Sequence, residues 1–176
     1  MRHPKANEQK RVEFKQTIKQ YESNGRVIVY IDESGFEQDA PRSHGYSDQH
    51  ERCYGTHDWQ TRKRTNAIGA LIGRHLLTVG LFEHSVDADT FHAWVCNDLL
   101  PKLPMSSIIV MDNAAFHKRE DIQQAISLEG HTLEFLPPYS PDLNPIEKKW
   151  AHIKSIRKKY RLPVQKLFTI ESIYDG

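Results

Sequence analysis

The chain has 176 residues, enough for one ordinary domain with a buried core. Hydrophobic residues make up 38% and charged residues 27%, which is typical of a globular protein and excludes disordered and fibrous classes. The net charge is +1, and no apolar run approaches the roughly 20 residues that cross a membrane. Two cysteines without a Cys-x-x-Cys pair, and no signal-type apolar segment after residue 5, predict a cytoplasmic protein without a zinc knuckle.

The first third of the chain predicts a helix, a strand and a long loop. Residues 7–23 have apolar side chains at helical spacing, followed by a glycine that can end the helix. A continuous β-branched run at residues 27–31 predicts a strand that is buried on both faces and ends at Asp32. Residues 35–64 are polar and rich in Gly, Pro, Ser and His, as in a long functional loop or a hairpin insertion.

The rest of the chain alternates strands and helices. Such alternation implies an α/β fold with a mixed sheet, in which ligands gather outside the carboxyl ends of parallel strands. The predicted elements are strands at 65–72 and 75–82, a helix at 86–100, a strand at 107–111 that ends at Asp112, a helix at 117–128, a strand at 132–136 and a helix at 145–160.

Two aspartates, Asp32 and Asp112, each follow a predicted hydrophobic strand, so they should lie at the same edge of one sheet. A single aspartate after a strand is more often a turn residue or a helix cap than a catalytic group. Two aspartates in the same context favour a catalytic role over a turn or cap role, because neighbouring carboxylates repel each other unless a divalent cation lies between them. Oxygen ligands favour Mg²⁺ or Mn²⁺ over zinc, and a pair of such ions is the usual device for attack on a phosphodiester.

The stretch LPPYSPDLNPIEKKW, residues 136–150, places four prolines before or at the start of a helix whose first turn carries Glu147. Asn144 to Glu147 fits a helix start, so the glutamate could simply close a capping box. Prolines restrict φ and hold the helix start in one place, which matters little for a cap and much for a metal ligand. Asp142, the other acid in this stretch, is interpreted as a turn residue.

Other polar residues near these acids have competing interpretations. His117 is either a residue that orients the metal ligands or a satisfied structural histidine. Asn113 fits a turn better than a metal ligand, and both Asn113 and Asn144 are expected beside the metal site without binding metal. Trp150 fits the apolar stripe of its helix better than a base-stacking role.

Positive charge is concentrated in residues 148–161, which hold seven Lys or Arg and no Asp or Glu. A surface that faces DNA phosphates is one interpretation, and an ordinary solvated helix face is the other. The candidate DNA contacts are Lys148, Lys149 and Lys154 in this run and Arg62, Lys63 and Arg64 in the preceding loop region.

Together these stretches resemble the DDE transposases of the mariner superfamily, and most closely the bacterial insertion-sequence family 630. The matching stretches are YIDESGF around Asp32, VMDNAAFH around Asp112 and LPPYSPDLNPIEKKW around Glu147, with RCYGTHDWQTRKRTNAIGAL between the first two. The resemblance covers roughly residues 26–161, and its last motif is the most specific.

The resemblance implies a ribonuclease H-like α/β fold, with a mixed five-stranded sheet flanked by helices. Asp32, Asp112 and Glu147 would bind two Mg²⁺ ions, which Mn²⁺ can replace. The implied activity is cleavage of DNA at transposon ends and transfer of the strand into target DNA. The implied catalytic domain spans residues 26–161, after an N-terminal helix and linker at 1–25 and before a C-terminal tail at 162–176.

The expected partners are double-stranded DNA of the transposon ends and the target, and a second copy of the chain in a homodimer. A separate helix-turn-helix chain is also expected, because residues 1–25 show no such motif where relatives carry one. The expected location is the bacterial cytoplasm, in association with the nucleoid. Two alternatives are a plain nuclease of the same fold and a non-catalytic protein that binds DNA or pairs with a full-length transposase.

Overall fold

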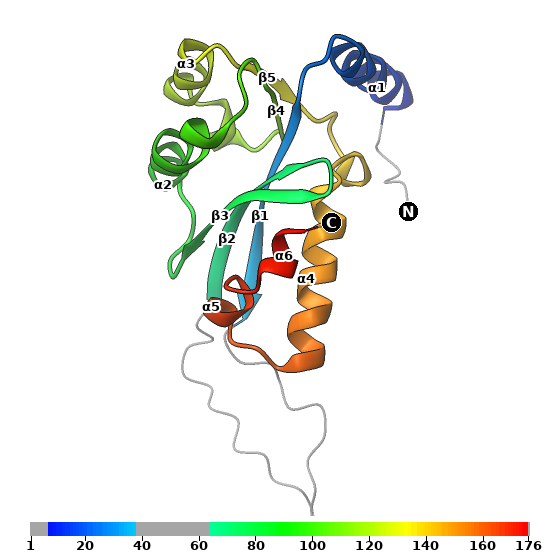
Figure 1. The fold of residues 1–176 in the computed structure, drawn as a ribbon. Helices are drawn as coiled ribbons and strands as arrows, with labels where there is room; N and C mark the ends of the chain where they lie inside the picture. The colour runs from blue at the N-terminus through cyan, green and yellow to red at the C-terminus, as the bar shows by residue number, and fades with distance from the viewer. Residues whose placement is uncertain (1–6, 38–63, 176) are drawn as a thin grey trace, which may run out of the picture.

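The computed structural model describes residues 7–37 and 64–175, which form a mixed five-stranded sheet flanked by helices (Figure 1). The strand order is β3-β2-β1-β4-β5. The first three strands are antiparallel, whereas β4 runs parallel to β1 and β5 runs parallel to β4. The strands are β1 (Ile28–Glu37), β2 (Arg64–Ile72), β3 (His75–Phe82), β4 (Ile108–Met111) and β5 (Thr132–Phe135). The predicted α/β architecture is confirmed.

The helices follow the predicted order, with two local differences. The predicted helix at 86–100 changes type along its length, from α to π to 3₁₀, and the predicted helix at 117–128 starts as a separate 3₁₀ turn, so His117 lies in that turn. The helices are α1 (Glu8–Ser23), α2 (Ala88–Trp94), η1 (Val95–Leu99), η2 (Leu100–Lys102), η3 (Ala115–Lys118), α3 (Glu120–Leu128), η4 (Pro141–Leu143), α4 (Ile146–Tyr160), α5 (Val164–Leu167) and α6 (Glu171–Tyr174).

Each face of the sheet is covered by its own set of helices (Figure 1). On one face, α2, η1 and α3 pack on alternate residues of the central strands, such as Val29, Ile31 and Ile109. On the other face, α1 packs over β1 and β4. Next to it, α4, α5 and α6 pack over β1, β2 and β3. Successive residues of β1 therefore point to opposite helical layers, because side chains alternate along a strand.

Strand β1 is longer than the sequence predicted. The prediction that it ends at Asp32 is wrong, because β1 continues to Glu37 as the antiparallel partner of β2. Its pairing with the short parallel strand β4 covers only residues 28–30. The apolar run therefore marks the part of β1 that is buried between two neighbours, and not the end of the strand.

Residues 162–176, predicted as a tail, contain α5 and α6. Val164, Leu167 and Ile173 are buried in the same cluster as Trp150 of α4, because they cover apolar sheet surface that α4 alone leaves open. No helix in the described residues has both the length and the apolar character needed to cross a bilayer.

Candidate active site

The sheet places Asp32 and Asp112 at the same level on adjacent strands. Tyr30 of β1 pairs with Val110 of β4, and each aspartate lies two residues further along its strand direction. Strand β4 stops at Met111, so Asp112 lies where the parallel pairing ends while β1 runs on. The prediction that both acids lie at one edge of the parallel strands therefore holds for Asp112, while Asp32 lies within a continuous strand.

Asp32 is a half-buried carboxyl group among other acids. Burial raises its pKa most, and the negative charges of Glu147, Glu33 and Asp112 raise it further, to about 8. A hydrogen bond from the backbone N–H of Glu33 opposes the shift only in part. Asp32 is therefore within electrostatic range of both Glu147 and Asp112, although the three acids are far apart in sequence.

Asp112 is oriented by a buried histidine. One carboxylate oxygen accepts hydrogen bonds from the backbone N–H of Ala114 at 2.8 Å and from Nδ1 of His117 at 2.6 Å. These contacts, chiefly the one from His117, lower the pKa of Asp112. The side chain of Asp112 is still 51% exposed, so its other oxygen can reach a ligand.

His117 links Asp112 to a fourth acid that the sequence motifs did not single out. Its Nε2 forms a hydrogen bond with Oε1 of Glu33 at 2.8 Å, and the centroids of the His117 and Phe91 rings are 4.5 Å apart. Burial alone would lower the pKa of His117, but the hydrogen bonds and charges of Asp112 and Glu33 outweigh it and raise the pKa to about 9. The two carboxylates thus favour the protonated form of His117, in which both nitrogens donate, and this fits the predicted role of orienting a ligand.

We expect His117→Ala to weaken both the fold and the site. The change leaves the carboxylates of Asp112 and Glu33 without their shared cation. Unfolding free energy should fall by roughly 3 kcal/mol, near the lower end for a broken buried pair because Asp112 is half-exposed. If Asp112 holds a metal ion, DNA nicking should fall about 10- to 100-fold. Thermal unfolding and a plasmid nicking assay measure the two effects.

The matched control is Phe91→Leu, which loosens the apolar side of His117 and leaves both of its acid contacts in place. This variant should lose stability and keep its rate of nicking per folded molecule. Wild-type nicking by His117→Ala would show that His117 is structural only.

Glu147 lies in the first turn of α4, exposed to solvent, and is not held in a capping box. The N-cap position is Pro145, no side chain caps the helix, and the described residues contain no hydrogen-bond partner for the Glu147 carboxylate. The capping interpretation of Asn144 and Glu147 is therefore not supported. The carboxylate of Glu147 is instead close enough to raise the pKa of Asp32.

A glycine in β2 allows α4 to approach the sheet beside Asp32. Gly69 pairs with Asp32 across β1 and β2. The buried indole of Trp150 packs directly on Gly69, and a Cβ at this position would come within 2.7 Å of the ring. Because Trp150 is one helical turn after Glu147, this contact fixes the distance between the glutamate and the sheet. The predicted core role of Trp150 is confirmed.

The proline-rich loop is tied to the sheet and to α1. The Asn113 amide donates to the Leu136 carbonyl, and the Leu136 N–H donates to the Met111 carbonyl at 2.9 Å. Asp142, interpreted as a turn residue, lies in η4 and also forms an ion pair with Arg11 of α1. Asn144 is 4% exposed, and its Oδ1 has no hydrogen-bond partner in the described residues.

The predicted DNA contacts have different surroundings. Lys148 is exposed, Lys154 is exposed with its Nζ 5.5 Å from the Phe36 ring centroid, and Lys149 is half-buried and donates to the Asp175 carbonyl. Arg64 is exposed and its guanidinium lies against Gly35 of β1. Arg62 and Lys63 lie outside the described residues.

The donor set of the site suits a hard divalent cation. All three predicted ligands are carboxylates, and the raised pKa of Asp32 reflects negative charge that a cation would neutralise. In residues 7–37 and 64–175, however, no three His, Cys, Asp or Glu side chains stand close enough together to form a ready metal site. One oxygen of Asp112 is turned towards His117. Forming the site would therefore require these side chains to move.

Solved structures with the same fold include transposases. The catalytic domain of Mos1 mariner transposase aligns with a TM-score of 0.64 at 15% identity, over 90% of this chain and 76% of that one. A structure of the Mos1 catalytic domain and Raltegravir with Mg aligns with a TM-score of 0.62 at 15% identity, over 99% and 88%. These likenesses confirm the ribonuclease H-like fold.

The Mos1 transposase paired-end complex with left transposon end aligns with a TM-score of 0.60 at 17% identity, over 82% of this chain and 47% of that one. This chain thus spans about half the length of the transposase in that complex. A search of curated protein sequences finds no match. The family described as DDE superfamily endonuclease matches residues 27–167, a region that contains Asp32, Asp112 and Glu147 and most of the chain. The chain therefore belongs to the DDE superfamily endonucleases.

Proposed function

We propose that this chain is the catalytic domain of a transposase that cleaves DNA at transposon ends and transfers the strand into target DNA. The observation that carries the proposal is the placement of Asp32 and Asp112 at the same level on adjacent parallel strands of a ribonuclease H-like sheet, with Glu147 in electrostatic range of Asp32. Membership of a DDE endonuclease family and the likeness to Mos1 transposase support it. The mariner-like motifs favour a bacterial insertion-sequence element of family 630 and a location at the nucleoid.

Asp32, Asp112 and Glu147 are the residues that would hold two Mg²⁺ ions, with Mn²⁺ as a substitute. When bound, such ions activate a water or a 3′ hydroxyl and stabilise the departing oxygen of the phosphodiester. The chain's own contribution is placement. His117 orients Asp112 through a hydrogen bond to one carboxylate oxygen, and the packing of Trp150 on Gly69 fixes the position of Glu147 relative to Asp32.

The partners in this proposal are double-stranded DNA, a second copy of the chain, and a helix-turn-helix unit that recognises the transposon ends. Exposed lysines on α4, Lys148 and Lys154, follow Glu147 on the same helix and would contact DNA phosphates. Lys149 is less suited to this role because it is half-buried and donates to a carbonyl of the C-terminal segment. Arg62, Lys63 and Arg64 are proposed as further phosphate contacts.

The test uses the purified chain with supercoiled plasmid and with a radiolabelled duplex that mimics a pre-cut transposon end. We expect nicking in Mg²⁺ or Mn²⁺, none in EDTA, and joining of the free 3′ hydroxyl to plasmid. Asp112→Asn, purified in the same way, controls for a contaminating nuclease.

Each alternative has its own result in this assay. Nicking that depends on the acids, without any joined product in the presence of transposon-end DNA, would indicate a plain nuclease. Binding of DNA without cleavage under any divalent-ion condition would contradict the enzymatic proposal and favour a non-catalytic regulator.

A further inference from the structure

Helix α1 precedes the region that matches the endonuclease family, yet it is packed on the catalytic sheet. Phe14 and Ile18 of α1 are buried against β1, β4 and Leu136. Among the Lys and Arg side chains of the described residues, the most buried is also on this helix: Arg11 is 1% exposed. A buried arginine is costly unless it is paired, so its partner is informative.

Arg11 has two acidic partners: Glu8 on the same helix, with 3.6 Å between Nε and Oε2, and Asp142, which lies 131 positions later in the chain and makes the shorter contacts. The guanidinium makes a bidentate contact, with Nη1 to Oδ1 at 2.9 Å and Nη2 to Oδ2 at 2.6 Å. The hydrogen bonds from Arg11 lower the pKa of Asp142, so the carboxylate stays ionised. The paired, planar geometry fixes the position of Asp142 more closely than a single contact would.

Asp142 is connected to Glu147 by a short run of consecutive turns. The Asn144 N–H donates to the Pro141 carbonyl at 2.9 Å, and the Glu147 N–H donates to the Asn144 carbonyl at 3.3 Å. Pro141 and Pro145 restrict φ at both ends of this run. A displacement of Asp142 is therefore passed to Glu147, because few backbone rotations between them are free to absorb it.

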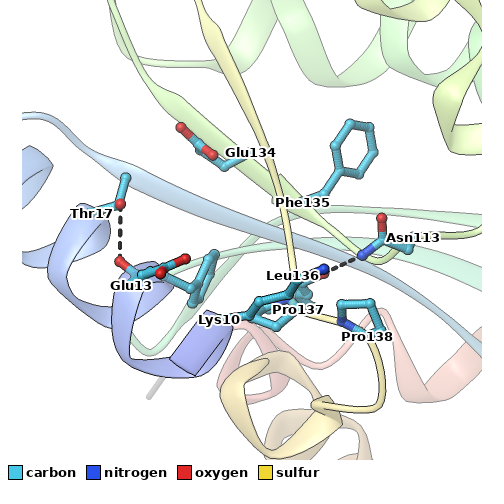
Figure 2. A pocket seen from close by; sticks show the side chains of 10 residues that line it. Lys10, Glu13, Thr17, Asn113, Glu134, Phe135, Leu136, Pro137 and Pro138 are labelled. Carbon is cyan, nitrogen blue, oxygen red and sulfur yellow. Dashed lines mark hydrogen bonds between the residues drawn. The ribbon is translucent and has the colours of Figure 1, made fainter. Parts of the chain in front are cut away.

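An open surface pocket of about 280 Å³ lies between α1 and the start of this loop (Figure 2). Lys10, Glu13 and Thr17 line it on the α1 side, and Pro137 and Pro138 line it on the loop side. On this side the loop is therefore not enclosed by apolar contacts. The ion pair supplies a directional constraint that a partly filled interface does not.

We propose that Arg11 is a positioning residue for the active site: through Asp142 it fixes the loop that leads into α4 and Glu147, and α1 is thereby part of the catalytic unit. The inference rests on the proposed function, in which Glu147 holds a metal ion. Loss of the ion pair should weaken metal binding through Glu147 while the remaining acids stay in place.

The test compares Arg11→Met, Asp142→Asn and the double variant with the wild-type chain. Mn²⁺ binding is followed by electron paramagnetic resonance, and plasmid nicking is measured against Mn²⁺ concentration. Each single variant should raise the Mn²⁺ dissociation constant and the half-saturating Mn²⁺ concentration by about 10-fold, as for residues that orient metal ligands. The double variant should be no worse than either single one, because both changes remove the same contact.

Arg11→Lys keeps the charge and loses the bidentate geometry, so it should fall between wild type and Arg11→Met. Two control variants separate positioning from stability. Lys19→Met removes one exposed charge from the same helix and should change nothing. Ile18→Ala loosens the packing of α1 without touching the pair, so it should lower the melting temperature and leave the half-saturating Mn²⁺ concentration unchanged.

The outcomes separate this inference from the proposed function. If the wild-type chain binds Mn²⁺ and the Arg11 and Asp142 variants bind it equally well, the positioning role is wrong and the proposed function stands. A shift of the same size in Ile18→Ala would also overturn the role, because general loosening would then explain it. If the wild-type chain binds no Mn²⁺, both the proposed function and the role of Arg11 fail. Should Arg11→Met fail to fold, Asp142→Asn and Arg11→Lys decide the question.

Discussion

Asp32→Asn is expected to abolish DNA cleavage and, in the absence of divalent ions, to stabilise the fold. The asparagine keeps the shape of the side chain and can still accept the hydrogen bond from the Glu33 backbone. It loses the charge that a metal ion requires. It also removes a carboxylate that is buried near Glu147, Glu33 and Asp112, whose charges repel it. Activity and stability should therefore change in opposite directions at this residue.

The gain in stability should depend on pH in a defined way. The pKa of Asp32 is about 8 in the folded chain, above its ordinary value of 3.8. The unfolded chain thus releases this proton at lower pH than the folded chain, and the wild type loses stability as pH rises between these two values. Asp32→Asn has no such group. The difference in melting temperature between variant and wild type should be small near pH 4 and largest near pH 8.

Thermal unfolding in EDTA across this pH range measures the effect. Each unit of pKa shift corresponds to about 1.4 kcal/mol. Each kcal/mol shifts the melting temperature of a domain this size by about 2–4 °C. Even a fraction of the pKa shift of Asp32 would therefore change the melting temperature by several degrees. Mg²⁺ should stabilise the wild type and leave the variant unchanged. A variant that is less stable than wild type at pH 8 in EDTA would contradict the crowding of carboxylates at Asp32.

Sequence patterns predicted the order of the elements better than their ends. The strands at 65–72 and 75–82 match β2 and β3 to within one residue, because a short turn and β-branched residues mark them clearly. The predicted strand ends at Asp32, whereas β1 continues, because an apolar run indicates only the part of a strand that is buried between two neighbouring strands. It gives no information on a part that pairs with a single neighbouring strand. That error hid Glu33, because residues 32–37 (DESGFE) have neither an apolar run nor a regular alternation that would mark them as a strand.

Contacts between distant parts of the chain were the features that sequence could not provide. The sequence did not single out Arg11 and predicted Asp142 only as a turn residue, because nothing local indicates a bidentate pair between them. The role of Gly69 is similar, since only the tertiary structure brings Trp150 onto it. His117 could be suspected from its spacing to Asp112, but its second partner became visible only with the fold.

Glu147→Gln is expected to remove cleavage without a cost in stability. The exposed carboxylate makes no capping contact in α4, so an amide of the same size should leave the melting temperature unchanged. Loss of a direct metal ligand should reduce nicking by more than the roughly 100-fold that is usual for residues that only orient ligands. The matched control is Glu171→Gln, which removes another exposed first-turn glutamate, from α6, and should retain full activity.

The two acids of the proline-rich loop should differ in their response to metal concentration. Asp142 acts only by fixing the loop, so high Mn²⁺ should restore most of the activity of Asp142→Asn by saturating a weakened site. Glu147→Gln lacks the ligand itself, so saturation with Mn²⁺ should not restore it. Nicking rates of both variants over a wide range of Mn²⁺ concentration measure the contrast. Full recovery of Glu147→Gln at high Mn²⁺ would mean that Glu147 is not a ligand, and the site would then need another third acid.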